Sequence, residues 1–212
     1  RRSSDLPNTT QTITYGNTAA LTGYGTAAPS GYLDSDASAD TISGALGTAT
    51  TNYVQGNDVG NYTLTATGSL SSSLGYTISY GTEANAITVV ARNVTASLTG
   101  SVSKTYDATT AATLSSGNYS LANVYSGDNS SALSLSYVTS GAYNDANVAT
   151  GETVSVSGLS LSGSKASNYT LDSSSISGTV GTITARAITL TANDQSMTYG
   201  DGNSLSAGYS IS

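Results

Sequence analysis

The chain has 212 residues, a net charge of −7, and no cysteine, histidine, tryptophan or phenylalanine. Without cysteine it has neither disulfides nor thiolate metal sites, and its six Lys and Arg residues cannot supply the clustered cations that nucleic-acid binding needs. Serine and threonine fill roughly a third of the positions, only 9% of residues are charged, and no apolar run approaches the ~20 residues of a membrane-spanning helix.

Apolar and polar residues alternate in six short runs along the chain, and none of these runs has helical spacing. Such alternation places aliphatic and tyrosine side chains on one face of a strand and hydroxyl side chains on the other. Gly158 interrupts the fifth run, where we expect a bulge or a bend. The sequence therefore predicts an all-β fold. The runs lie at 62–66, 76–80, 94–98, 133–137, 154–161 and 188–192.

Three segments repeat a Thr-Tyr pair that is followed by Gly or Asp. Their tyrosines are Tyr15, Tyr106 and Tyr199, spaced by 91 and 93 positions, and recurrence at this spacing predicts a core or corner role. Arg92 and Arg186 each stand between two alternating runs, 94 positions apart. We interpret these arginines as module junctions with almost no linker, which is typical of a stiff head-to-tail array.

The repeats predict four segments. Residues 1–10 form a leader or linker, residues 11–91 and 92–185 form one β-sandwich each, and residues 186–212 begin a further module whose apolar faces are incompletely covered. We expect tandem Ig-like or Greek-key antiparallel β-sandwiches in an elongated arrangement. Because the chain starts at Arg1 without a signal peptide, we expect it to be a piece of a longer protein. Richness in Ser, Thr, Asn and Gly with scarce lysine indicates an extracellular setting.

Several motifs carry a family resemblance. KTYDATT at 104–110, SGD at 126–128 and SNYTL at 167–171 make the second module resemble the bacterial YDG repeat, although Ala108 replaces the glycine of the Tyr-Asp-Gly motif. TYG at 14–16, VGNYTL at 59–64 and YTISY at 76–80 make the first module similar to the MBG repeat, a bacterial Ig-like β-sandwich family. Residues 188–203 resemble the start of another MBG unit.

This resemblance implies a function that composition alone does not indicate. Such repeats occur in large secreted bacterial proteins similar to filamentous haemagglutinins, so we expect a structural stalk in a secreted or surface-attached adhesin that mediates cell adhesion or biofilm formation. Its first partners would be neighbouring repeats of the same chain. The alternative is a module that recognises a host or matrix glycan or a partner protein through its loops. We expect neither nucleic-acid binding nor membrane insertion.

We expect no enzymatic activity and no cofactor. Histidine and cysteine are absent, and a Ser-Lys dyad would have to use Lys104 or Lys165, neither of which has a nucleophile context. The best metal candidate is a calcium loop formed by Asp34, Asp36 and Asp40. This loop lacks the glycine and the terminal glutamate of an EF-hand, and we favour a solvated acidic loop.

Three weaker hypotheses concern single side chains. Tyr24, Tyr32 and Tyr53 lie in the Gly/Ser-rich part of the first module and are the candidates for exposed, ligand-binding aromatics. Lys104 could form a Lys–Asn isopeptide bond, against the simpler interpretation of an exposed lysine at a strand end. Asn-X-Ser/Thr triplets are glycosylation acceptors in principle, but those in the NY(T/S)L motif are better explained as turn residues before a strand. These motif triplets begin at Asn61, Asn118 and Asn168.

Overall fold

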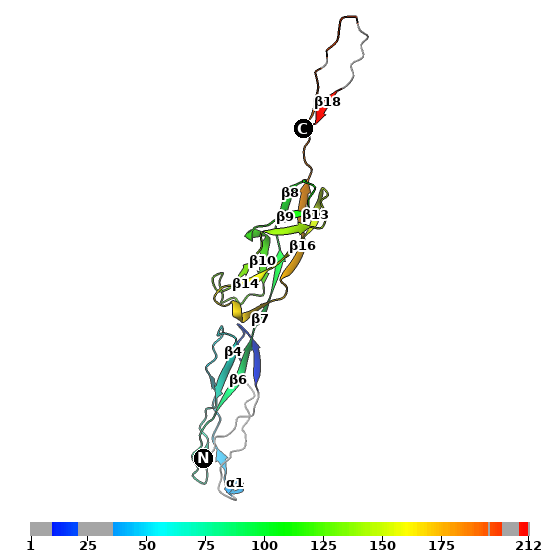
Figure 1. The fold of residues 1–212 in the computed structure, drawn as a ribbon. Coiled ribbons are helices and arrows are strands. Elements are labelled where there is room, and N and C mark those ends of the chain that lie inside the picture. The colour runs from blue at the N-terminus through cyan, green and yellow to red at the C-terminus, as the bar shows by residue number, and fades with distance from the viewer. Residues whose placement is uncertain (1–9, 21–35, 195, 201–207, 212) are drawn as a thin grey trace. The chain divides into compact units, whose positions relative to one another are not determined.

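The structure is a computed structural model that describes residues 10–20, 36–194, 196–200 and 208–211. Nine residues of the expected leader, together with Tyr24, Tyr32 and Asp34, lie outside this part of the chain. Helical structure in the described residues is limited to α1 (Asp36–Ala39) and two 3-10 turns, Ser116–Asn118 and Ala166–Asn168. The remaining regular elements are strands, which confirms the all-β prediction (Figure 1).

The chain divides into two compact units that do not follow the sequence linearly. Unit 1 comprises Arg1–Ser97, Ser120–Tyr137 and Gly158–Ser174, and unit 2 comprises Leu98–Tyr119, Val138–Ser157 and Ser175–Ser212. The expected module bounds of 11–91 and 92–185 do not coincide with these units and stay a prediction about the repeats in the sequence.

Unit 1 is built around a four-stranded sheet in the order β1-β6-β4-β3. Its strands are β1 (Gln11–Thr14), β6 (Thr82–Val90), β4 (Gly60–Thr65) and β3 (Thr50–Thr51). Most of a three-stranded sheet and two strand pairs complete the unit. The sheet contains β10 (Tyr119–Ala122), β7 (Arg92–Leu98) and β15 (Tyr169–Leu171), and the pairs are β11 (Ser134–Ser136) with β14 (Ser160–Ser162) and β2 (Ile42–Ser43) with β5 (Ser71–Ser72).

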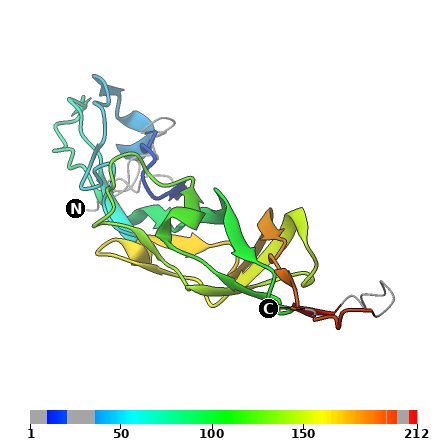
Figure 2. The same ribbon diagram turned by 90° about the horizontal axis from the view of Figure 1, so that it is seen from above.

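Unit 2 is built around a five-stranded sheet in the order β8-β16-β13-β12-β9. Its strands are β8 (Val102–Thr105), β16 (Ser175–Thr184), β13 (Ala149–Ser157), β12 (Ser140–Tyr143) and β9 (Ala111–Thr113). The two longest, β13 and β16, are antiparallel neighbours (Figures 1 and 2). A separate pair joins β17 (Leu190–Ala192) to β18 (Tyr209–Ile211).

The two large sheets share one topology. In each, the first strand pairs in parallel with the last, and the last pairs antiparallel with the strand before it. The backbone N–H after the first strand also bonds the end of the last strand in both sheets, from Tyr15 to Val90 and from Tyr106 to Thr184, each at 2.8 Å. The recurrence of Tyr15 and Tyr106 in the sequence therefore corresponds to one recurring position in the fold.

The pairing departs from the prediction in direction. We expected antiparallel sandwiches, but β1 with β6, β8 with β16 and β15 with β7 are parallel. Side chains alternate between the two faces of a strand whichever way its neighbour runs, so an alternating pattern cannot report strand direction.

Most of the predicted runs coincide with strands, with one exception. Gly158, with φ of 88°, separates β13 from β14, as the expected bend requires. The strand predicted at 76–80 is wrong, because residues 76–79 form no strand. The two tyrosines of this run hold loops instead: Tyr76 donates to Asp36 at 2.6 Å, and the Tyr80 hydroxyl accepts the N–H of Leu70 at 2.8 Å.

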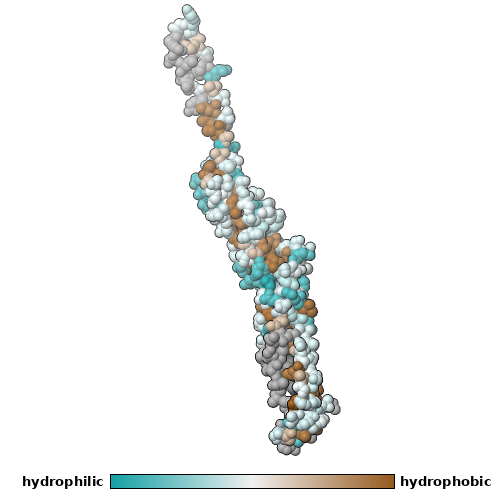
Figure 3. Space-filling view, turned by 180° about the vertical axis from the view of Figure 1, so that it is seen from behind, coloured by the Kyte–Doolittle hydropathy of each residue, from teal (hydrophilic) through white to brown (hydrophobic). Residues whose placement is uncertain are grey.

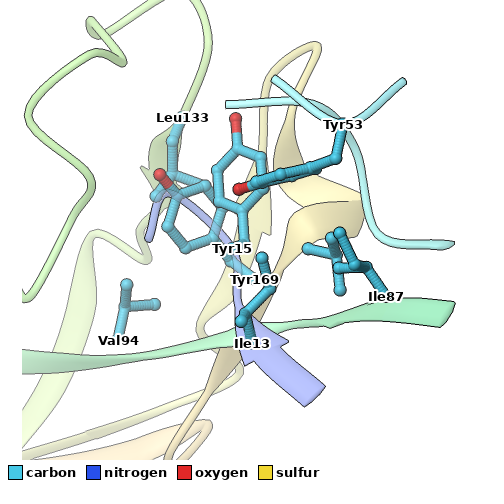
Figure 4. Close-up of a cluster of buried hydrophobic side chains, with 8 residues drawn as sticks. Ile13, Tyr15, Tyr53, Ile87, Val94, Leu133 and Tyr169 are labelled. Atoms are coloured by element: carbon cyan, nitrogen blue, oxygen red, sulfur yellow. The ribbon is translucent and has the colours of Figure 1, made fainter. Parts of the chain in front are cut away.

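The main core of unit 1 contains residues from both sides of the expected junction at residue 92. Figure 4 shows the tyrosine rings of this cluster lying against aliphatic side chains from β1, β6 and β7. The buried members are Ile13, Tyr15, Tyr53, Ile87, Val89, Val94, Leu133 and Tyr169. On the face drawn in Figure 3, most of the surface is pale or teal and the hydrophobic patches are separate, as the abundance of Ser and Thr leads one to expect.

Candidate functional site

A densely bonded site in unit 1 contains residues from both expected modules, and we call it the joint. It is formed by Tyr15, Gly16, Asp58, Arg92, Tyr125, Asp128, Lys165, Asn168 and Tyr169. All of these residues belong to unit 1. They come from the TYG, SGD and SNYTL motifs and from the loop before β4.

At the centre of the joint, one carboxylate accepts two tyrosine hydroxyls. The Tyr15 side chain, which follows β1 and is fully buried, donates to Asp128 Oδ2 at 3.1 Å, and Tyr169 donates to the same oxygen at 2.5 Å. The Tyr15 ring meets Tyr169 and Tyr125 edge-on, with ring centroids 5.2 and 5.8 Å apart. Edge-to-face aromatic pairs and charge-assisted hydrogen bonds are both directional, so they fix the relative orientation of the segments that carry them.

Electrostatics keep both tyrosines protonated. Burial, followed by the hydrogen bond to Asp128, raises the pKa of Tyr15 to about 12. The same two causes, in the same order, raise the pKa of Tyr169. A phenol whose pKa lies far above neutrality remains a hydrogen-bond donor, and the carboxylate of Asp128 is the matching acceptor.

A second polar contact lies beside the tyrosines. Lys165 Nζ is 2.5 Å from Asp58 Oδ1, and Asn168 donates to the same oxygen at 2.8 Å while its own Oδ1 accepts the N–H of Val59 at 2.8 Å. The hydrogen bonds from Lys165 and Asn168 lower the pKa of Asp58. Asn168 is only 1% exposed and uses both ends of its amide. These hydrogen bonds join the loop before β4 to the start of β15.

Arg92 binds residues on both sides of the expected junction. Its Nε donates to the backbone oxygen of Tyr15 at 2.7 Å and its Nη2 to Asn17 Oδ1 at 2.7 Å. Its Nη1 donates to Asn123 Oδ1 at 3.2 Å. The planar guanidinium can hold three acceptors at once, so Arg92 contacts residues of both expected modules.

The ring of Tyr125 packs so closely against two glycines that neither position has room for a side chain. A Cβ atom built on Gly16 would lie 2.5 Å from Tyr125 Cγ, and one on Gly127 would lie 2.5 Å from Tyr125 Cε1. Gly16 also has a φ of +81°, which L-residues rarely adopt. The glycine of the TYG motif is therefore needed for both its backbone conformation and the close approach of the Tyr125 ring.

The structure corrects two expectations about tyrosines. Tyr53 is not an exposed aromatic: it is 6% exposed and donates to the backbone oxygen of Asn17 at 2.5 Å, because it belongs to the core cluster around Tyr15. The core or corner role holds for Tyr15, but Tyr106 is 38% exposed and Tyr199 is fully exposed. Positions that recur in the sequence thus differ in burial.

The calcium candidates hold a turn together. Asp40 accepts the hydroxyls of Ser72 and Ser73 at 2.7 and 2.9 Å, and Asp36 accepts the hydroxyl of Tyr76. Within the described residues, no group of three His, Cys, Asp or Glu side chains is arranged to hold a metal ion. Asp34 lies outside that part of the chain, so the three-carboxylate loop stays a hypothesis.

The remaining candidates have defined partners. Lys104 Nζ pairs with Asp107 at 2.7 Å and donates to Thr109 at 2.5 Å, while Lys165 belongs to the joint. Asn118 and Asn168 end the two 3-10 turns directly before β10 and β15, which agrees with the turn interpretation of the NY(T/S)L motif. Asn61 differs, because it lies within β4.

The sequence did not show which of its motifs contact one another in the folded chain. TYG, SGD and SNYTL were each identifiable as recurring or family-like segments, but Tyr15 and Asp128 are separated by 113 positions. The burial of Asn168 was also missed, since an Asn before a strand is usually a solvated turn residue. One signal was present at Tyr15, whose recurrence in the sequence predicted the core role that the structure shows for it.

Comparison with known proteins assigns part of the chain. Residues 90–178 match the YDG domain family. No curated protein and no solved structure matches the chain. No helix in the described part is long and apolar enough to cross a membrane. The matched range contains Arg92, Asp128 and Tyr169, and so supplies one side of the joint. Residues 90–178 of this chain are a YDG domain.

Proposed function

We propose that the chain is a structural segment of a secreted or cell-surface bacterial adhesin, made of an MBG-like repeat followed by the YDG domain and the start of another MBG-like repeat. The single observation that carries this proposal is the joint: the residues before position 92 and those after it share one buried cluster and one polar network. A spacer needs contacts of this kind, because tension must pass from one repeat to the next.

The chemistry of the joint suits a load-bearing role. Tyr15, Tyr169 and Asp128 make charge-assisted hydrogen bonds that are partly buried, and parallel pairing of β1 with β6 ties the first strand of the repeat to its last. The family resemblance and the composition, rich in Ser and Thr and poor in lysine, support the extracellular and adhesive context. The tandem Ig-like description of the repeats belongs to the same proposal.

Single-molecule pulling on the chain, held at its two ends, tests the mechanical role. Asp128→Asn removes the charge that two tyrosine hydroxyls share, and we expect unit 1 to unfold at a lower force or in more steps than in the wild type. Asp145→Asn is the matched control, since within the described part of the chain Asp145 in unit 2 accepts only a local backbone N–H, from Asn147. Identical force distributions for Asp128→Asn and the wild type would count against a load-bearing joint.

The adhesive context needs a separate test on cells. Antibodies against this chain should label intact bacteria that carry its gene, and deletion of that gene should reduce their attachment to a surface. Labelling only after the cells are broken open would contradict the proposed location.

A further inference from the structure

The end of the unit 2 sheet repeats the geometry that forms the joint in unit 1. In both sheets a tyrosine follows the first, parallel strand, and an arginine stands two positions after the residue whose carbonyl bonds the tyrosine N–H. These pairs are Tyr15 with Arg92 and Tyr106 with Arg186. In each sheet, the loop between the two strands that precede the last one in the chain carries an acid: Asp58 between β3 and β4 in unit 1, and Asp145 between β12 and β13 in unit 2.

The two ends differ in what covers them. Tyr15 is buried because Tyr125, Asp128 and Tyr169 lie on it, whereas Tyr106 is 38% exposed. Among the described residues, the Tyr106 hydroxyl and the Arg186 guanidinium have no hydrogen-bond partner, whereas Tyr15 and Arg92 have several. Exposed aliphatic residues, Ile188 and Leu190, follow directly after Arg186.

We propose that the Tyr106–Arg186 end of unit 2 is a docking surface for a sandwich module that continues the chain from Arg186. This inference rests on the proposed structural role. The partner is defined by chemistry: it presents a carboxylate to the Tyr106 hydroxyl and an aromatic ring to the Tyr106 ring, as Asp128 and Tyr169 do for Tyr15. A cation near Asp145 would complete the match with Lys165 and Asp58.

One residue difference between the two sheet ends limits how closely the docked module can approach Tyr106. Asp107 stands where unit 1 has Gly16, and it is held by Lys104 at 2.7 Å and by the N–H of Thr109 at 2.9 Å. A ring cannot approach this position as closely as Tyr125 approaches Gly16. The docked module therefore contacts Tyr106 mainly through the hydroxyl and the ring edge.

A spliced chain that carries a second copy of the YDG domain tests the proposal. Residues 1–185 are followed directly by residues 92–212, so that a second YDG domain begins where Arg186 stood, and Tyr106 of the second copy is replaced by Phe. Nitration by tetranitromethane, mapped by mass spectrometry, reports how accessible each tyrosine is. We expect Tyr106 to react at least about tenfold more slowly in the spliced chain than in the 212-residue chain, because docking buries it. Tyr199, fully exposed, is the internal reference.

The outcomes separate this proposal from the one it rests on. Tyr15 should be protected in both chains, and a reactive Tyr15 in the 212-residue chain would count against the proposed function. A protected Tyr15 with a Tyr106 that reacts as fast in the spliced chain, and in the second version described below, as in the 212-residue chain would overturn the docking surface alone. Protection that appears only after Asp107→Gly would also overturn it for this chain.

A second version guards against a splice that disturbs unit 2. It appends residues 92–185, with Tyr106 of this copy replaced by Phe, after Ser212 through a flexible Gly/Ser linker and leaves the original chain intact. Slow nitration of Tyr106 in either version supports the proposal. Fast nitration in both versions, with Tyr15 still protected, contradicts it.

Discussion

The ends of the two large sheets differ in burial although their first and last strands pair in the same way and make an equivalent backbone hydrogen bond. In the sheet β1-β6-β4-β3 the terminal tyrosine is at the centre of a hydrophobic cluster, and in the sheet β8-β16-β13-β12-β9 it lies at the surface. The strand that precedes each tyrosine fixes its backbone. The segments that fold over it, such as 125–128 and 165–169, determine whether the ring is buried.

Truncation of each tyrosine should give the largest difference between the two ends. Tyr15→Ala removes a fully buried ring and leaves the Asp128 carboxylate with one fewer donor, so we expect a loss of about 3–5 kcal/mol in unfolding free energy. Tyr106→Ala, at a partly exposed position, should cost about 1 kcal/mol or less. Urea denaturation followed by circular dichroism measures both. Equal losses would mean that the burial of Tyr15 adds no unfolding free energy beyond what the exposed Tyr106 contributes.

The second-largest effect is expected at alkaline pH, which should destabilise the joint. The pKa of Tyr15 is raised from 10.0 to about 12 in the folded chain, and that of Tyr169 is raised as well. A raised pKa in the folded state stabilises the protein fully below pH 10, and this contribution is lost as the pH rises from about 10 to about 12. The unfolding free energy should therefore fall across this range, and less steeply in Tyr15→Phe. Stability that stays constant from pH 9 to 12 would contradict this assignment.

The smallest effect concerns the motif that gives the YDG domain its name. Ala108 occupies the glycine position of Tyr-Asp-Gly and has a φ of +63°, a left-handed conformation that costs an L-residue about 1 kcal/mol. Ala108→Gly should therefore raise the unfolding free energy of the chain by up to about 1 kcal/mol. Thermal denaturation measures the gain, with the exposed Ala111 changed to Gly as the control that should destabilise its strand.

Sequence reasoning reached the fold class and the recurring positions, because both are local. The run at 94–98 alternates in the sequence and in the burial of Val94 and Ala96. The features that sequence reasoning did not predict depend on long-range geometry. Alternation does not encode strand direction, so the parallel pairing of β1 with β6 was missed. It also does not show which distant loop covers a tyrosine, so Tyr53 was expected at the surface.

The most direct test of a joint that couples the repeats is a double-mutant cycle between Tyr15→Phe and Asp128→Asn. These residues are 113 positions apart in the sequence, and they lie on opposite sides of the expected junction at residue 92. We predict a coupling of about 1 kcal/mol or more in the unfolding free energy, because Tyr15→Phe removes the donor of the hydrogen bond and Asp128→Asn removes the negative charge that strengthens it. Additive effects, within about 0.3 kcal/mol, would show that the two residues do not interact. The two repeats would then not be held together at this point.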